Sequence, residues 1–154
     1  MGFEDIGELA TQAVTTTEVE VTEKARDFFG AKIPFTKTKV IYSYQVRIKA
    51  GYDFGQIKWE KKDAIIYVQL PKVKVLSNEI DKKSFKLYHE AESIFSPVTM
   101  EENNKAEIQM QERAEKNAIK AGLFEEAEEN AKKMLEPFFK QNSEYAGCTI
   151  KFEN

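Results

Sequence analysis

The stretch from Val40 to Ala50 alternates strictly between two kinds of side chain, and this pattern constrains the fold more than any other feature of the sequence. Successive side chains of a β-strand point to opposite faces, so the alternation predicts an antiparallel strand with one buried face. The opposite face is mostly polar. The face expected in the core carries Val40, Tyr42, Tyr44, Val46, Ile48 and Ala50.

Other segments before Ser96 also have strand character, because they alternate or are rich in β-branched residues. Ala64–Leu70 is expected to form a hairpin with Ile57 and Trp59 across the polar turn Glu60–Asp63. By contrast, Glu23–Gly30 predicts a short helical turn or loop with Phe28 and Phe29 turned inward. The remaining strands are expected at Thr11–Val21, Lys72–Leu76 and Ser84–His89, the last two on either side of a turn at Asn78–Asp81.

After Ser96 and Pro97 the periodicity becomes helical. Thr99 and Glu102 have the spacing of a capping box, in which each side chain binds a backbone N–H group at the start of a helix. The first helix places small residues and Met110 on one narrow stripe, and Gly122 is expected to end it or to act as a hinge. The apolar face of a second helix is expected to carry Leu123, Phe124, Ala127, Ala131, Met134, Leu135 and Phe138.

Two features shape the C-terminal part of the chain. Pro137 lies inside the second helical pattern, and it is expected to kink that helix or to end it early. Cys148–Phe152 alternates again and predicts a last strand that returns to the sheet.

Together these elements predict an α+β fold with a mostly antiparallel sheet, two C-terminal helices and a short closing strand. The chain has 154 residues, which suits one domain with a substantial core. We therefore expect a single globular domain over residues 1–154. It would be strand-rich over 1–95 and helical over 97–141, with the closing strand at 147–153.

Charge and composition exclude several classes of partner. The chain has 23 Lys and Arg against 26 Asp and Glu, a net charge of −3, so we expect no nucleic-acid partner. No run approaches the roughly 18 apolar residues that cross a bilayer. The N-terminal sequence MGFEDIGELA is not that of a signal peptide, so the chain as it stands is expected to be soluble.

No catalytic constellation emerges, so we assign no catalytic residue, metal or cofactor and favour a non-enzymatic role. His89 and Cys148 are the only histidine and the only cysteine, which is too few for an ordinary zinc site. They could form a reactive pair only if the closing strand lay beside Ser84–His89. A hydrolase using acidic residues would need two facing carboxylates, drawn from Asp53, Asp81 and Glu90, in one cleft.

A ligand site is one alternative to a contact surface. Tyr52, Asp53 and Phe54 come after the end of the regular alternation and are flanked by Gly51 and Gly55. Tyr52 and Phe54 are expected to be the most exposed aromatic side chains of this region. Turn chemistry is the simpler interpretation of Asp53. The alternative function is a small-ligand or peptide-binding module, with an aromatic-lined groove between the sheet and the Leu123–Phe139 helix.

Four parts of the sequence together resemble the bacterial domain of unknown function 4230: Glu4–Thr11, Ile48–Asp53, Leu70–Pro71 followed by Val75–Asp81, and Ala114–Ala131. This family has no assigned activity. The resemblance implies a hydrophobic segment before the domain, which this sequence lacks. We therefore expect the soluble part of a membrane-anchored bacterial envelope protein, on the extracytoplasmic side, that acts through protein or surface contacts. Its partner would be an unknown protein, and it would reach the membrane only through that anchor.

Overall fold

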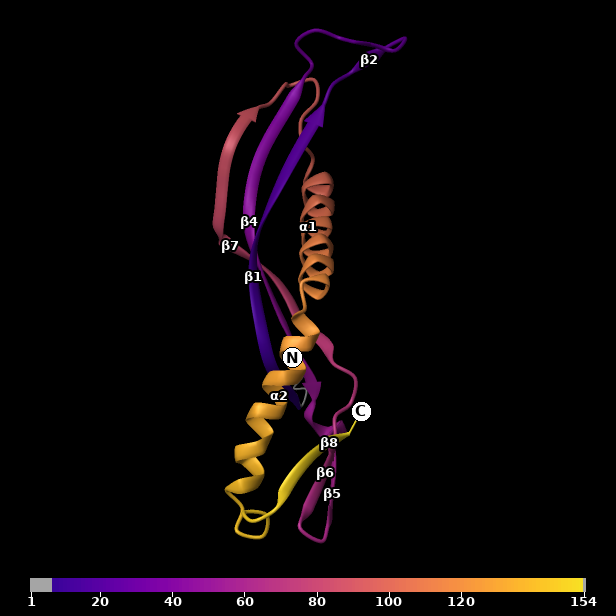
Figure 1. The fold of residues 1–154 in the computed structure, drawn as a ribbon. Coiled ribbons are helices and arrows are strands. Elements are labelled where there is room, and N and C mark those ends of the chain that lie inside the picture. The colour runs from indigo at the N-terminus through magenta and orange to yellow at the C-terminus, as the bar shows by residue number, and fades with distance from the viewer. Residues whose placement is uncertain (1–6, 154) are drawn as a thin grey trace, which may run out of the picture. The chain divides into compact units, whose positions relative to one another are not determined.

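The structure is a computed structural model, and it describes residues 7–153 (Figure 1). Residues 1–6 and residue 154 lie outside the described residues. The predicted α+β fold is confirmed, with mostly antiparallel sheets and a helical C-terminal half. The elements are β1 (Glu8–Lys24), β2 (Asp27–Phe28), β3 (Ala31–Lys32), β4 (Thr38–Asp53), the 3₁₀-helix η1 (Phe54–Gln56), β5 (Lys58–Lys62), β6 (Ile65–Gln69), β7 (Lys74–Ala91), α1 (Met100–Lys120), α2 (Leu123–Lys140) and β8 (Thr149–Glu153).

These strands form three sheets, in the orders β1-β4-β7, β2-β3 and β5-β6-β8. The described residues divide into two compact units. The first unit contains residues 7–14, 48–77 and 118–153, and the second contains residues 15–47 and 78–117. The expected single domain over residues 1–154 stays a prediction.

In the second unit, α1 packs against strand residues through the predicted stripe of small side chains. Ala106, Met110 and Ala114 are buried, as are Tyr42 and Val46 on the alternating face of β4. Small side chains let a helix approach its neighbour closely, and Met110 fills the space that remains. The predicted stripe and the predicted core face of β4 are therefore confirmed in this unit.

Polar contacts also join α1 to the strands of the second unit. The side-chain amide of Asn78 donates to the carbonyl oxygen of Gln111 at 3.0 Å, and the amide of Gln111 donates back to the carbonyl oxygen of Asn78 at 2.8 Å. Arg113 Nε donates to the largely buried Glu18 carboxylate at 2.9 Å. These partners satisfy groups that would otherwise be costly to bury.

The first unit is built around α2 and the sheet β5-β6-β8. β6 pairs antiparallel with β5 and parallel with β8. On α2 the buried residues recur at every fourth position, which places them on one face of the helix. They meet the strands in one hydrophobic cluster, whose buried members are Tyr52, Ile57, Ile66, Val68, Ala131, Leu135 and Phe139.

Gly51 lies where β1 and β4 approach very closely in this unit. A Cβ atom at this position would lie 2.0 Å from the carbonyl oxygen of Leu9. The sequence suggests that Gly51 supplies backbone freedom at a bend, but it lies within β4 and its role is to leave room for β1.

Two strand predictions were wrong in detail. Lys74–Leu76 and Ser84–His89 belong to one strand, β7, rather than to two strands around a turn, and Lys72 and Val73 precede that strand. The physical reason is that the Asn78 side chain, a turn former in the sequence, binds α1 instead. The β5–β6 hairpin is confirmed, but its turn is only Asp63 and Ala64, since Lys62 pairs with Ile65. Asp63 takes the required positive φ of 56°.

The helical predictions also need two corrections. Pro137 does not end α2 early, because it lies in the last turn and the helix continues to Lys140. Met134 and Phe138, expected on the apolar face, are about half exposed, whereas Phe139 is buried in their place. Gly122 separates the helices with a φ of 101°, as expected of a terminator.

Candidate functional site

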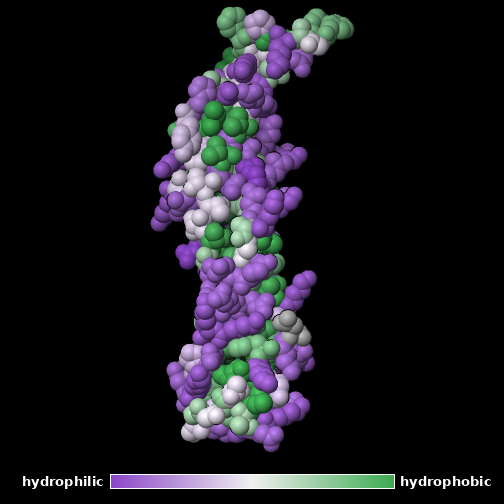
Figure 2. Space-filling view, viewed as in Figure 1, coloured by the Kyte–Doolittle hydropathy of each residue, from purple (hydrophilic) through white to green (hydrophobic). Residues whose placement is uncertain are grey.

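The second unit carries large apolar side chains that water reaches. We call Phe28, Phe29, Ile33, Phe35, Ile94 and Phe95 the aromatic platform. Phe29 is 96% exposed, Phe35 94% and Ile94 86%, values far above those of core residues. Figure 2 shows apolar groups in the region where β2 lies in Figure 1. Isolated exposed apolar residues are ordinary, but a group of them marks an interaction surface.

The hairpin of β2 and β3 presents Phe29 in an unusual backbone conformation. Phe28 pairs with Ala31, so Phe29 and Gly30 are the two turn residues, and their φ angles are 49° and 81°. Positive φ at both positions is the signature of a type I′ turn, which favours Asn, Asp or Gly first. A phenylalanine there costs about 1–3 kcal/mol. The expectation that Phe28 and Phe29 point inward was therefore wrong.

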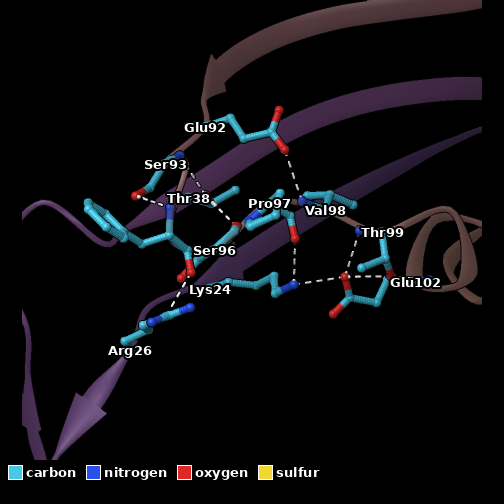
Figure 3. Close-up of polar contacts among 11 residues, drawn as sticks. Lys24, Arg26, Thr38, Glu92, Ser93, Ser96, Pro97, Val98, Thr99 and Glu102 are labelled. Carbon is cyan, nitrogen blue, oxygen red and sulfur yellow. Dashed lines mark hydrogen bonds and ion pairs between the residues drawn. The ribbon is translucent and has the colours of Figure 1, made fainter.

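A network of polar contacts joins the two segments that carry the platform (Figure 3). The buried Thr38 hydroxyl donates to the carbonyl oxygen of Ser96 at 2.7 Å and accepts from the backbone N–H of Ser93 at 2.8 Å. The Ser93 hydroxyl donates to the carbonyl oxygen of Phe35 at 2.8 Å, and Arg26 Nε donates to that of Phe95 at 2.8 Å. The two segments that carry the platform are thus held together by directional bonds.

The same network continues to the start of α1. Lys24 Nζ donates to the carbonyl oxygen of Pro97 and to Glu102, both at 2.8 Å. The predicted capping box is confirmed, since the Thr99 N–H group donates to Glu102 and the Glu102 N–H group donates to the Thr99 hydroxyl. Lys24, and then Thr99, lower the pKa of Glu102 to about 2. Glu102 therefore stays charged and keeps the helix start fixed.

Four of the six platform residues lie in a basic stretch of an acidic chain, whereas Ile94 and Phe95 follow Glu90 and Glu92. Residues 24–39 include five basic residues and one acidic residue, although the whole chain has a net charge of −3. Lys39 Nζ lies 2.9 Å from Glu23, and Lys39 and Lys37 lower the pKa of that carboxyl group. Lys32 is exposed and stands opposite Asp27 in the hairpin.

The first unit has a second candidate site, a hollow of about 470 Å³ beside the end of α2. The rings of Trp59 and Phe139 are 5.7 Å apart, and those of Phe139 and Tyr145 are 6.1 Å apart. Lys61 Nζ lies 5.7 Å from the centre of the Tyr145 ring. The hollow is lined by Trp59, Phe138, Phe139, Gln141, Asn142 and Tyr145.

Tyr52, Asp53 and Phe54 have three different environments. Tyr52 is buried in the hydrophobic cluster, where burial raises its pKa to about 12. Its expected exposure was wrong, because the alternation of β4 continues through Gly51 and carries Tyr52 onto the core face. The Asp53 carboxylate accepts from the Gly55 N–H group at 3.0 Å and caps η1. Phe54 is exposed, as expected, but Trp59 in the same region is slightly more exposed. Their role in ligand binding stays a prediction.

A family model described as "Protein of unknown function (DUF4230)" matches residues 1–150. The chain belongs to the DUF4230 family. The resemblance in the sequence is therefore confirmed, and the description of DUF4230 names no activity and no site residues. Searches of curated proteins and of solved structures gave no match.

The remaining candidate residues of this DUF4230 domain are His89, Cys148, Asp81 and Glu90. β8, next to Cys148, pairs with β6, so the condition set for a Cys148–His89 pair is not met. Asp81 accepts from the backbone N–H of Lys83, which is local strand chemistry, and Glu90 is exposed. Within residues 7–153, no group of three His, Cys, Asp or Glu side chains could hold a metal ion.

The part of the DUF4230 chain that the structure describes contains the helices α1 and α2. Neither α1 nor α2 combines the length and the apolar character that a membrane-crossing helix needs.

Proposed function

We propose that this DUF4230 domain is a non-enzymatic contact domain of a bacterial envelope protein, and that the aromatic platform is its contact surface. One observation carries the proposal: Phe29 is 96% exposed at a turn position that disfavours phenylalanine. Burial of a phenylalanine side chain contributes about 1.5–3 kcal/mol. Phe29 does not gain this burial free energy in the isolated chain, and its backbone is strained at the same residue. A partner that covers the ring best explains both features.

The envelope location rests on what the family resemblance implies. DUF4230 members commonly have a hydrophobic segment before the domain, so the domain would be held at a membrane, on its extracytoplasmic side. A contact domain held there meets lipid and envelope proteins at high local concentration, which makes even weak contacts effective.

The test places a photo-crosslinking benzoyl-phenylalanine at Phe29 of the protein in its bacterial cells. A comparison variant carries the same group at Phe138, which is 53% exposed and lies in the first unit. Adducts with envelope lipid or protein at Phe29 and not at Phe138 support the proposal. Equal labelling at both positions, or none at Phe29, overturns it.

A small-ligand or peptide-binding module is the second candidate, favoured by the hollow beside Trp59. The inner space between the sheet and α2 is filled by the hydrophobic cluster, so a ligand would bind at the outer edge. Aromatic grooves suit extended proline-containing peptides. Trp59 is the only tryptophan, so its fluorescence reports directly on the hollow. Titration with short proline-rich peptides should change it, and an unchanged signal would remove this candidate.

A further inference from the structure

The aromatic platform has basic side chains close by, and this combination points to one kind of partner. We propose that it inserts into the interfacial layer of a bilayer that contains anionic phospholipid. This inference rests on the proposed function, because it names the partner of the same surface. It adds a membrane contact to the anchor that the family resemblance implies.

The apolar part of the proposal is the tip of the β2–β3 hairpin. Phe28 and Phe29 are exposed and their ring centres are 4.7 Å apart. Exposed aromatic and aliphatic side chains bind membranes by burying their surface at the headgroup boundary. Insertion also requires that backbone polar groups keep their partners. The hairpin meets this need through the pairing of Phe28 with Ala31 and of Asp27 with Lys32.

The charged part consists of Arg26 and Lys32, because Lys24 pairs with Glu102, and Lys37 and Lys39 pair with Glu23. Basic residues beside an apolar surface attract the headgroups of anionic lipids, and this attraction falls off within a Debye length. Lys32 lies in the hairpin itself, within three residues of Phe29, and Arg26 precedes the hairpin. The whole chain is acidic, so general electrostatics would keep it away from such a bilayer. Attraction therefore has to come from this local stretch.

The composition of the platform favours a bilayer over a protein partner. Protein interfaces are enriched in Phe, Tyr, Trp, Met and Arg and depleted in Lys. The phenylalanines of the platform suit either kind of partner, but the exposed Lys32 beside them suits a bilayer better. Segments that lie in the membrane interface combine Phe with Lys. A protein partner and a second copy of this chain are outcomes that the experiment separates.

The experiment is co-sedimentation of the whole 154-residue chain with vesicles of phosphatidylcholine, with or without phosphatidylglycerol. Binding is expected with phosphatidylglycerol, and should weaken by about tenfold or more for Phe29→Ser combined with Phe35→Ser. Met134→Ser, which changes an exposed apolar side chain of the first unit outside the hollow, should leave binding unchanged. Lys32→Glu should weaken binding by about tenfold, and Lys58→Glu, an exposed lysine of β5, should have less effect.

A second measurement keeps the proposal testable if the serine variants fold poorly. Trp59→Phe removes the native fluorophore and Phe29→Trp places a new one at the tip. Its emission should shift to the blue with phosphatidylglycerol vesicles and be quenched by brominated acyl chains. Unchanged emission, together with no co-sedimentation, overturns the bilayer proposal.

The two levels of the proposal fail in different ways. If Phe29 crosslinks to an envelope protein in cells while vesicles do not bind, the contact surface stands and the bilayer is overturned. If sedimentation analysis shows that the chain self-associates and that Phe29→Ser abolishes this, the partner is a second copy. If Phe29 neither crosslinks nor binds vesicles, both proposals are overturned.

Discussion

The hydroxyl group of Thr38 bridges two backbone groups of the segment that carries Ile94 and Phe95. It donates to the carbonyl oxygen of Ser96 at 2.7 Å and accepts from the N–H group of Ser93 at 2.8 Å. Thr38 is fully buried, so water cannot replace either bond. The Thr38 side chain, at the start of β4, therefore holds the segment of Ile94 and Phe95 beside the segment that carries Phe35.

Thr38→Val should destabilise the protein, because it keeps the shape of the side chain but leaves two backbone groups without their partner. The expected loss is about 1–3 kcal/mol in the free energy of unfolding, measured by urea denaturation. Thr15→Val makes the same change at an exposed position of β1, where it should alter stability by less than about 0.5 kcal/mol. Equal effects of the two substitutions would contradict the role of Thr38.

The capping carboxylate should titrate far below its ordinary range. In the folded protein the pKa of Glu102 is about 2, against an ordinary value of 4.5, because Lys24 and Thr99 bind its charged form. A carboxyl group whose pKa is lowered by folding stabilises the folded protein at pH values above its ordinary pKa. This contribution is lost as the pH falls from about 4.5 toward 2. NMR titration of the Glu102 side-chain carbon measures it directly. In Lys24→Met the pKa should rise toward 4.5, and no change would contradict the assignment.

Two adjacent phenylalanines should differ sharply in their effect on stability. Phe139 is 2% exposed and lies in the hydrophobic cluster of the first unit, whereas Phe138 is 53% exposed. Phe139→Ala should cost about 3–5 kcal/mol through lost burial and the cavity left behind. Phe138→Ala should cost less than about 1 kcal/mol. Denaturation curves of the two variants provide the comparison, and similar midpoints would argue against this packing of α2.

Gly51→Ala should destabilise the first unit. The new methyl group would lie 2.0 Å from the carbonyl oxygen of Leu9, so the backbone of β1 or β4 must move. The expected cost is about 2 kcal/mol or more, by analogy with overpacked cores. Gly147→Ala is the control, since a Cβ atom there meets no atom within 4 Å among the described residues. A fully tolerated Gly51→Ala would show that β1 lies farther from β4.

Much of the fold could be predicted because its signals are local. The alternation of β4, the capping box of Thr99 and Glu102, and Gly122 between the helices each depend on neighbours in the sequence. β7 was missed as one strand because the partner of Asn78 is Gln111, on a helix far along the chain. No local pattern around Asn78 contains that information.

The candidate site was harder to predict for a related reason. Phenylalanine usually points into the core, so Phe28 and Phe29 were expected to do the same. Gly30 carries a turn signal, but it also suits a helix terminator. Only the pairing of Phe28 with Ala31 shows a two-residue turn with Phe29 at its tip. Tyr52 was expected to be exposed and is buried. Gly51 suggests the end of the alternation, but β4 continues through it to Asp53.

The most direct measurement of where this chain touches a bilayer is hydrogen–deuterium exchange, with and without vesicles that contain phosphatidylglycerol. Insertion of the aromatic platform predicts slower exchange in residues 27–35 and 93–96, and unchanged exchange around Trp59 and Phe138. Slower exchange at the hollow of the first unit alone, or no change in residues 27–35 under conditions where the chain binds, would contradict it.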